Sequence, residues 1–264
     1  MFSWRARRQL AAMGIVAAIF VGIAVWFGAR LIPSPTCFDN RQNHGEVGVD
    51  CGGPCLACEL KNPKPLSVFW TRLAPAGGDW YDAAALVENQ NQILASGDVR
   101  YEFALFDELG LVARKSGSTF VYPQERLIIA EPALRTTRRP VRVEFRVIAI
   151  AWRTGRESAP SIIVEHRDYT IAAGGEGEKK QSIVTADLFK ASPLGFRAFA
   201  VTVAVFDPAG NLIGANKVAG DTLAAGGRAK IKSLWPSALP GDAGKIEIIP
   251  RVNLFDPEVI IKPQ

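Results

Sequence analysis

Four cysteines are the residues best placed to do chemistry, because all of them fall within one short stretch of the chain. They are Cys37, Cys51, Cys55 and Cys58. An even number of cysteines in an exported, glycine-rich segment predicts two local disulfides, which supply the order that so short a segment cannot obtain from a core. Four cysteines allow three pairings, and the sequence does not choose among them.

Zinc binding is the alternative for these cysteines, because Cys55 and Cys58 have the spacing of a metal knuckle and Cys51 is close by. A reducing cytoplasm would favour zinc, whereas an oxidising compartment favours disulfides. A thiol-exchange pair at Cys55 and Cys58 would need a surrounding βαβ pattern, and the sequence shows none.

Side chains with oxygen donors are interleaved with the cysteines, at Asp39, Asn43, Glu46 and Asp50. With Gly45 and Gly48 permitting tight turns, they could wrap a calcium ion, which is the one cofactor for which the sequence holds a candidate site. The spacing matches no EF-hand loop. The alternative is that they are polar turn residues of a disulfide-closed loop.

The two histidines, His44 and His166, suggest no catalytic group. No nucleophile elbow, phosphate loop or dinucleotide fingerprint accompanies them. Glu165 and Asp168 flank His166, as expected for a solvated strand edge. We therefore assign no catalytic residues and expect a protein that is not an enzyme.

The net charge of +5 is concentrated around one apolar stretch, which Arg5, Arg7, Arg8 and Arg30 flank. Without these four, 27 basic residues face 26 acidic ones in everything after Arg30. A nucleic-acid-binding protein should show a concentrated basic face, so we expect no nucleic-acid partner.

The apolar stretch predicts a membrane anchor, because Leu10 to Ala29 is 20 residues without a charge. As a helix it would span about 30 Å, the thickness of a bilayer's hydrocarbon core. We expect a cytoplasmic tip at 1–8 and a transmembrane helix at 9–32. The three arginines before the span place the N-terminus in the cytoplasm and the rest of the chain outside.

A cleaved signal peptide is the rival interpretation of this stretch, although its apolar core would be shorter and Gly28-Ala29-Arg30 is a poor cleavage site. Either interpretation exports the remaining chain. Gly14, Ala18 and Gly22 place small residues on one helix face, which would permit close approach of two helices. Such spacing also arises by chance in alanine-rich spans.

The cysteine segment, expected at 33–60, resembles short motifs of bacterial surface and envelope proteins that contain an Asp-Cys-Gly-Gly-x-Cys-x-x-Cys core. The matching residues are Cys37, Asp39, Asn43, Gly45, Glu46, Asp50, Cys51, Gly52, Gly53, Cys55 and Cys58. Asn40 stands where glycine is usual, and asparagine tolerates the same left-handed backbone. The resemblance implies export and implies no reaction.

An internal repeat organises the chain beyond the polar hinge at residues 61–65. Tyr101 to Ala113 matches Val201 to Ile213, and Phe-Asp-x-x-Gly recurs in both at an offset of 100 residues. Apolar residues alternate with others in each copy, which predicts a strand with one buried face. Asp and Gly then predict a turn into the next strand, so each copy should contain a β-hairpin.

A period near 100 residues with many short strands predicts two immunoglobulin-like β-sandwich domains, at 61–156 and 157–264. Val141 to Val147 and Lys245 to Val252 are the predicted closing strands. Ala172 to Lys180 is a predicted long loop. Only Ala83 to Gln92 shows even weak helical periodicity. The expected fold class is mainly β, after an N-terminal transmembrane helix and a small Cys-rich segment.

The first hairpin motif, Phe103-x-Leu105-Phe106-Asp107, resembles the FxLYD-type β-sandwich domain, related to late-embryogenesis-abundant-like sandwiches. The second copy, Val203-x-Val205-Phe206-Asp207, is a weaker match, and both copies carry Phe where the family usually has Tyr. The resemblance implies a sandwich fold and an extracytoplasmic setting, and supplies no catalytic residues.

The expected function is that of a non-enzymatic protein anchored once in the cytoplasmic membrane, whose sandwich modules serve protein interaction or envelope assembly. One alternative is a calcium- or ligand-binding envelope sensor. Another is an accessory subunit of a secretion or pilus machine. We expect a protein partner, and the sequence does not identify it.

Overall fold

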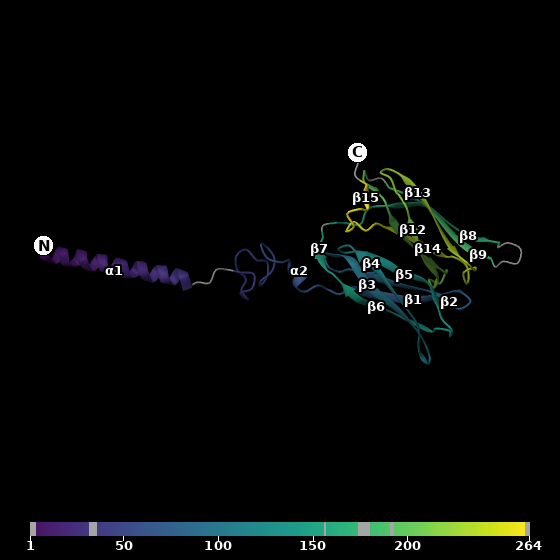
Figure 1. Ribbon diagram of the computed structural model, residues 1–264, viewed down its shortest axis with the longest axis horizontal. Helices are drawn as coiled ribbons and strands as arrows, with labels where there is room; N and C mark the ends of the chain where they lie inside the picture. The colour runs from purple at the N-terminus through teal and green to yellow at the C-terminus, as the bar shows by residue number, and fades with distance from the viewer. Residues whose placement is uncertain (1–3, 32–35, 156, 174–179, 191–192, 262–264) are drawn as a thin grey trace. The chain divides into compact units, whose positions relative to one another are not determined.

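The computed structural model of the chain describes residues 4–31, 36–155, 157–173, 180–190 and 193–261 (Figure 1). It is mainly β, with one long helix at the N-terminus and several antiparallel sheets. The chain divides into two compact units, Met1–Cys58 and Glu59–Gln264.

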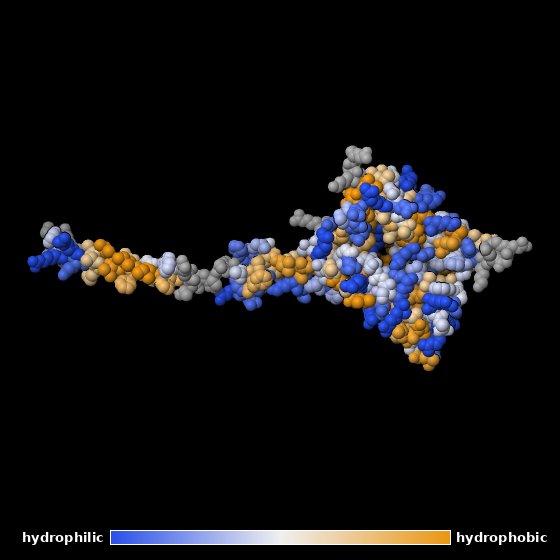
Figure 2. All heavy atoms as spheres, in the orientation of Figure 1, coloured by the Kyte–Doolittle hydropathy of each residue, from blue (hydrophilic) through white to orange (hydrophobic). Residues whose placement is uncertain are grey.

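The first unit begins with helix α1, Trp4–Leu31. Its segment Arg8–Gly28 is long and apolar enough to cross a membrane, and none of it is buried within the protein. Figure 2 shows apolar residues along this helix. The helix begins at Trp4, inside the predicted tip at 1–8, so residues 4–8 of the tip continue directly into the described part of the span.

The second unit holds the short helix α2 (Cys58–Lys61), whose first residue closes the first unit, and all fifteen described strands. The strands are β1 Ser67–Gly77, β2 Trp80–Glu88, β3 Leu94–Asp107, β4 Gly110–Val121, β5 Arg126–Arg135, β6 Arg142–Ile150, β7 Arg153–Thr154, β8 Ile163–Ala172, β9 Gln181–Phe189, β10 Gly195–Phe196, β11 Phe199–Phe206, β12 Leu212–Gly220, β13 Arg228–Trp235, β14 Lys245–Arg251 and β15 Ile260–Ile261.

Two sandwiches with the same strand order make up this unit. In the first, sheet β1-β2-β5 packs against sheet β4-β3-β6, with β7 paired to the start of β3. In the second, sheet β13-β9-β8 packs against sheet β12-β11-β14, and β10 pairs with β15 nearby. Strand β3 corresponds to β11 through the sequence repeat, so each sheet of one sandwich has a counterpart in the other.

Each sandwich has its own apolar core, because apolar residues alternate with others along its strands and point to one face. Tyr101, Phe103 and Leu105 of β3 face the core of the first sandwich. Val201, Val203 and Val205 of β11 face the core of the second. The predicted hairpins are confirmed: β3 pairs with β4 and β11 with β12, and both turns contain a glycine with positive φ, Gly110 and Gly210.

The two sandwiches stack face to face, which gives four layers of sheet (Figure 1). The face of β1-β2-β5 that points away from its own core packs against the corresponding face of β12-β11-β14. We call this contact the seam. Its buried residues are Ala74, Ala84, Ile128, Ala130, Ala204, Phe206, Leu212 and Ala215. Many are alanines, and small side chains let two sheets approach closely.

The seam joins unlike sheets. The first sandwich contributes β1-β2-β5, whereas the second contributes β12-β11-β14, which is the counterpart of β4-β3-β6. The charged sheet β4-β3-β6 of the first sandwich and the sheet β13-β9-β8 of the second therefore lie on the outside of the stack.

The seam explains one weak sequence pattern and corrects one expectation, that the strand from Val201 has a single buried face. The weak helical pattern from Ala83 to Gln92 belongs to strand β2 and the turn after it; Ala83 and Ala85 face the first core while Ala84 faces the seam. Strand β11 is buried on both faces, because Ala204 lies in the seam.

The closing strands are confirmed as β6 and β14, which pair with β3 and β11. Most of the predicted loop from Ala172 to Lys180 lies outside the described residues. The predicted limits of the two sandwich domains, 61–156 and 157–264, stay a prediction.

Candidate functional site

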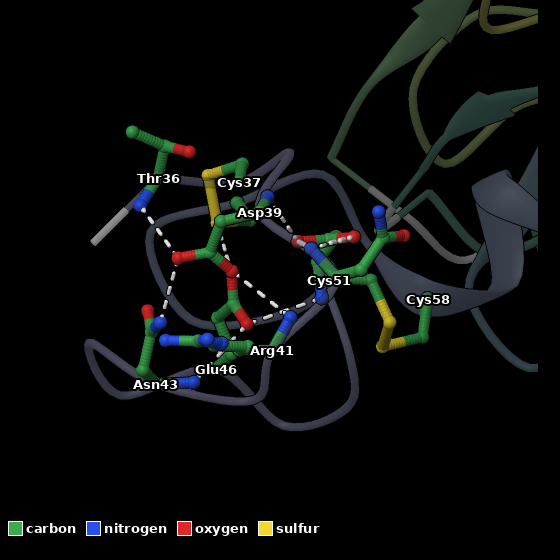
Figure 3. The surroundings of a disulfide bond; sticks show 11 residues. Thr36, Cys37, Asp39, Arg41, Asn43, Glu46, Cys51 and Cys58 are labelled. Atoms are coloured by element: carbon green, nitrogen blue, oxygen red, sulfur yellow. Dashed lines mark hydrogen bonds between the residues drawn. A yellow bond between two sulfur atoms is a disulfide. The ribbon is translucent and has the colours of Figure 1, made fainter. Parts of the chain in front are cut away.

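The cysteine loop, residues 36–58, is closed by two disulfides (Figure 3). Cys37 pairs with Cys55, and Cys51 pairs with Cys58. This selects one of the three pairings that the sequence left open. Zinc would need free thiolates, so the disulfide-bonded loop offers no sulfur ligand for it.

The acidic side chains of the loop hold its backbone in place. Asp50 Oδ1 accepts hydrogen bonds from the backbone N–H groups of Asp39 and Asn40, at 3.0 and 3.1 Å. Glu46 Oε2 accepts one from the N–H of Asp50 at 3.1 Å. Both carboxylates are buried. They therefore satisfy donors that a loop without regular structure would leave unpaired.

Asp39 and Asn43 form a third contact, in which Asn43 Nδ2 donates to Asp39 Oδ2 at 2.8 Å (Figure 3). This hydrogen bond is the main reason that the pKa of Asp39 lies below its ordinary value. The four predicted calcium ligands thus lie in one loop, and each makes a hydrogen bond within it. Calcium binding there stays a prediction.

Among the residues that the structure describes, one trio of metal-ligating types comes together, formed by Cys37, Glu46 and Cys55. Glu46 Oε1 lies 3.1 Å from Cys55 Sγ. This is a contact and not a hydrogen bond, because a disulfide sulfur carries no proton. The trio is a carboxylate beside a disulfide, and only the carboxylate could bind a cation.

Left-handed backbone shapes the loop as the sequence predicted. Asn40 has φ +56°, so asparagine does replace the usual glycine in a left-handed turn. Gly52 has φ +78°, and a Cβ there would come within 2.6 Å of Val47 Cβ. Gly52 is therefore required both by its backbone angle and by the lack of space.

The two histidines belong to different units of the chain, and both are exposed. His166 lies on β8 with its side chain 81% exposed, and its Nδ1 is 3.8 Å from Asp187 Oδ2. His44 lies in an exposed turn of the cysteine loop. Neither arrangement resembles a general base held against a nucleophile.

The seam contains buried charges that sequence reasoning missed. Asp82 of β2 is 1% exposed and accepts three hydrogen bonds. The donors are the backbone N–H groups of Ala133 and Ala215, at 3.0 and 3.1 Å, and Nε1 of Trp235, at 2.9 Å. Two of these donors belong to the second sandwich. Burial is the main cause that raises the pKa of Asp82 above its ordinary value.

Glu131 of β5 is the second buried carboxylate of the seam. It accepts hydrogen bonds from Tyr101 Oη at 2.7 Å and from Lys217 Nζ of the second sandwich at 2.6 Å. Lys115 Nζ lies 3.3 Å away. Burial strongly raises the pKa of Tyr101, and the charge of Glu131 and the Tyr101–Glu131 hydrogen bond raise it further. The phenol therefore keeps its proton.

Arg251 of β14 forms the third polar link. Its guanidinium donates two hydrogen bonds to the carboxylate of Glu125, of 2.9 and 2.8 Å, and lies over the ring of Phe120. Beside it, Tyr122 Oη donates to the carbonyl of Val252 at 2.6 Å. Burial raises the pKa of Tyr122 to about 12, which preserves this donor at neutral pH.

One sequence signal could have pointed to these residues. Asp82 precedes three alanines, and Glu131 ends the apolar run from Leu127 to Ala130. A charge inside an apolar strand is rarely buried without partners. No protein-family model matches the chain, and no curated protein matches it.

Proposed function

We propose that the protein is anchored once in the cytoplasmic membrane by α1, with its N-terminus in the cytoplasm and everything after the helix outside. The apolar segment Arg8–Gly28 supports the anchor, and the arginines before it support this orientation. The two disulfides that follow support an oxidising compartment, since cytosolic thiols stay reduced. This pairing of an apolar helix with a disulfide-closed loop carries the proposal.

The exported part acts as a rigid display unit for protein contact or envelope assembly, and it performs no reaction. The observation that supports this rigidity is the seam, where apolar packing is combined with the polar links of Asp82, Glu131 and Arg251. Sandwiches of this kind recognise partners through loops and exposed strand edges. The FxLYD-type, immunoglobulin-like relationship belongs to the same proposal and is supported by the hairpin motif.

A topology experiment on the full-length chain tests the proposal. The protein would carry one epitope tag at each end. Protease would be added to cells whose outer envelope has been made permeable while the cytoplasmic membrane stays closed. We expect loss of the C-terminal tag and survival of the N-terminal tag. Survival of both tags, together with four free thiols in a labelling assay, would contradict export and the disulfides at once.

The calcium-sensor alternative makes a different prediction for the cysteine loop. A bound calcium ion stabilises the folded loop by mass action, so added calcium should protect residues 36–58 from protease in the full-length protein. Magnesium at the same concentration is the control. If calcium and magnesium have the same effect, the display function stands without a calcium site.

Partner capture tests the display function itself. Tagged full-length protein, purified from membranes in mild detergent, should retain a protein partner. The partner should be lost when the exposed loops are altered and kept when the Cys-rich loop is altered. The accessory-subunit alternative predicts instead a set of partners that belong to one secretion or pilus machine.

A further inference from the structure

A cleft of about 750 Å³ opens between the two sandwiches at one end of the seam. The first sandwich lines it with the β1–β2 turn and the end of β5, and the second with β12 and the end of β13. Clefts between domains are common ligand sites. Because both sandwiches belong to one compact unit, the cleft is a fixed feature of it.

The walls of the cleft are apolar and accessible. Trp80 on one side and Leu234 on the other are each 43% exposed. Pro132 and Pro236 extend these walls. Exposed large apolar residues that face a common cleft offer a site for the apolar part of a ligand.

The floor of the cleft holds the carboxyl group of Asp82, which forms no ion pair among the described residues, while Arg135 is a cation elsewhere in the lining. Asp82 lines it, and its three hydrogen-bond donors are uncharged. Among the described residues, no lysine, arginine or histidine nitrogen lies within 4.0 Å of its carboxylate. Asp79 adds a second acid at the exposed rim. A buried carboxylate without a counterion attracts a cation.

Trp80 already attracts a cation. The guanidinium of Arg135 lies over its ring, 5.8 Å from the ring centre. This distance is near the outer limit of a cation–π contact, and Arg135 is exposed, so the side chain is free to give way to a ligand. Asn216, at the opposite wall, has a side-chain oxygen that accepts a hydrogen bond from the N–H of Lys217 at 2.8 Å and keeps a second lone pair for another donor.

We propose that this cleft binds an organic ammonium group carried on an apolar stem, as in a diamine or a lysine side chain. The stem packs between Trp80 and Leu234, and the ammonium points to the floor above Asp82. The inference rests on the cleft alone and does not depend on the membrane topology, so either can fail without the other.

Three matched probes test the charge requirement on the full-length protein in neutral detergent, by calorimetric titration. They are 1,5-diaminopentane, pentane-1,5-diol and glutarate, which share a short carbon chain and differ in charge. We expect the diamine to bind at least tenfold more tightly than the diol, and glutarate not to bind. Equal binding of diamine and diol, or no binding of the diamine, would overturn the proposal.

Two variants locate the binding. Trp80→Ala removes an exposed wall and should weaken diamine binding about tenfold without loss of the fold. Asp82→Asn removes the charge at nearly constant volume and should abolish the preference for diamine over diol. Leu109→Ala, at an exposed position outside the cleft, is the matched control and should leave binding unchanged. Unchanged diamine binding by Trp80→Ala would place the ligand elsewhere and refute the cleft.

A second pair of probes separates the two sources of the ammonium. Nα-acetyl-lysine methylamide and Nα-acetyl-norleucine methylamide share a backbone and differ in the ammonium. If the lysine compound binds more tightly than 1,5-diaminopentane, a lysine residue of a peptide is the ligand; if less tightly, a free diamine is. Equal binding of the lysine and norleucine compounds would count against the proposal.

Discussion

The carboxylate of Asp82 accepts a hydrogen bond of 2.9 Å from the indole Nε1 of Trp235, a residue 153 positions later in the chain. Asp82 lies on a central strand of the first sandwich, and Trp235 lies in the core of the second. The bond therefore links the core of one sandwich to the seam face of the other. We expect the two sandwiches to unfold together for this reason.

Replacing Asp82 tests this link. In Asp82→Ala the N–H groups of Ala133, Ala215 and Trp235 lose their acceptor inside the seam, and unpaired buried donors are costly. We expect the free energy of unfolding to fall by about 2–4 kcal/mol. Urea denaturation followed by tryptophan fluorescence measures it. Asp221→Ala, at an exposed position, should change it by less than about 0.5 kcal/mol.

The Glu131 cluster should respond unequally to the removal of its members. Glu131→Ala leaves Tyr101 and Lys217 without their shared acceptor and should cost about 3 kcal/mol. Lys217→Met should cost less than about 1 kcal/mol, because Lys115 still neutralises Glu131 and Lys217 is partly exposed. Urea denaturation of both single variants and the double variant gives the coupling. Equal losses in the two single variants would mean that Lys115 does not share the charge.

We expect the buried Lys190 to destabilise the second sandwich. Lys190 is fully buried, and its Nζ has no hydrogen-bond partner among the described residues, although it lies over the ring of Phe196. Lys190→Met removes the buried amine at similar volume and should raise the free energy of unfolding by about 1–2 kcal/mol at pH 7. Lys232→Met, on an exposed position of β13, is the control.

The gain from Lys190→Met should depend on pH. Burial lowers the pKa of Lys190 from its ordinary value of 10.5, so the folded state opposes the charged amine while the unfolded state accepts it. The penalty in the natural protein is complete below the lowered pKa and disappears as the pH rises towards 10.5. Unfolding curves between pH 7 and 10 should converge for the two proteins. A constant difference would show that Lys190 acts through packing alone.

Reduction should act on the cysteine loop alone. All four cysteines lie at or before Cys58, so the unit Glu59–Gln264 contains no cysteine. In full-length protein, dithiothreitol should make residues 36–58 sensitive to protease and leave the urea midpoint of the second unit unchanged. Mass spectrometry of unreduced fragments should find the links Cys37–Cys55 and Cys51–Cys58. Any other pair would contradict the loop described above.

Local patterns explain how much of this fold the sequence could predict. The turn after β3 forms as expected, because Asp107 Oδ1 accepts hydrogen bonds from the N–H groups of Leu109 and Gly110. The same residues recur after β11, where Asp207 binds Asn211. These contacts involve residues at most four apart, so residue type and spacing suffice to predict them.

The seam could not be predicted in this way, because it joins residues that are far apart in the chain. The strand alternation around Val201 indicates one buried face and gives no sign that Ala204 lies against another sheet. Asp82 acquires its role only when Ala215 and Trp235 reach it from the second sandwich. The choice among three disulfide pairings depended likewise on the folded path of the loop.

The stacking of unlike sheets has a consequence for self-association. A head-to-tail contact does not close on itself, so this stack leaves an outer sheet at each end that a further copy would have to cover. The cross-strand pair Thr202 and Ile249 lies on the stacked sheet, whereas its counterpart on the outer sheet is the ion pair of Glu102 with Arg146, at 2.8 Å. The Arg146 side chain is 65% exposed, so docking another chain there would remove water from its charge. We therefore expect this ion pair to oppose the docking of a further sandwich on the outer sheet.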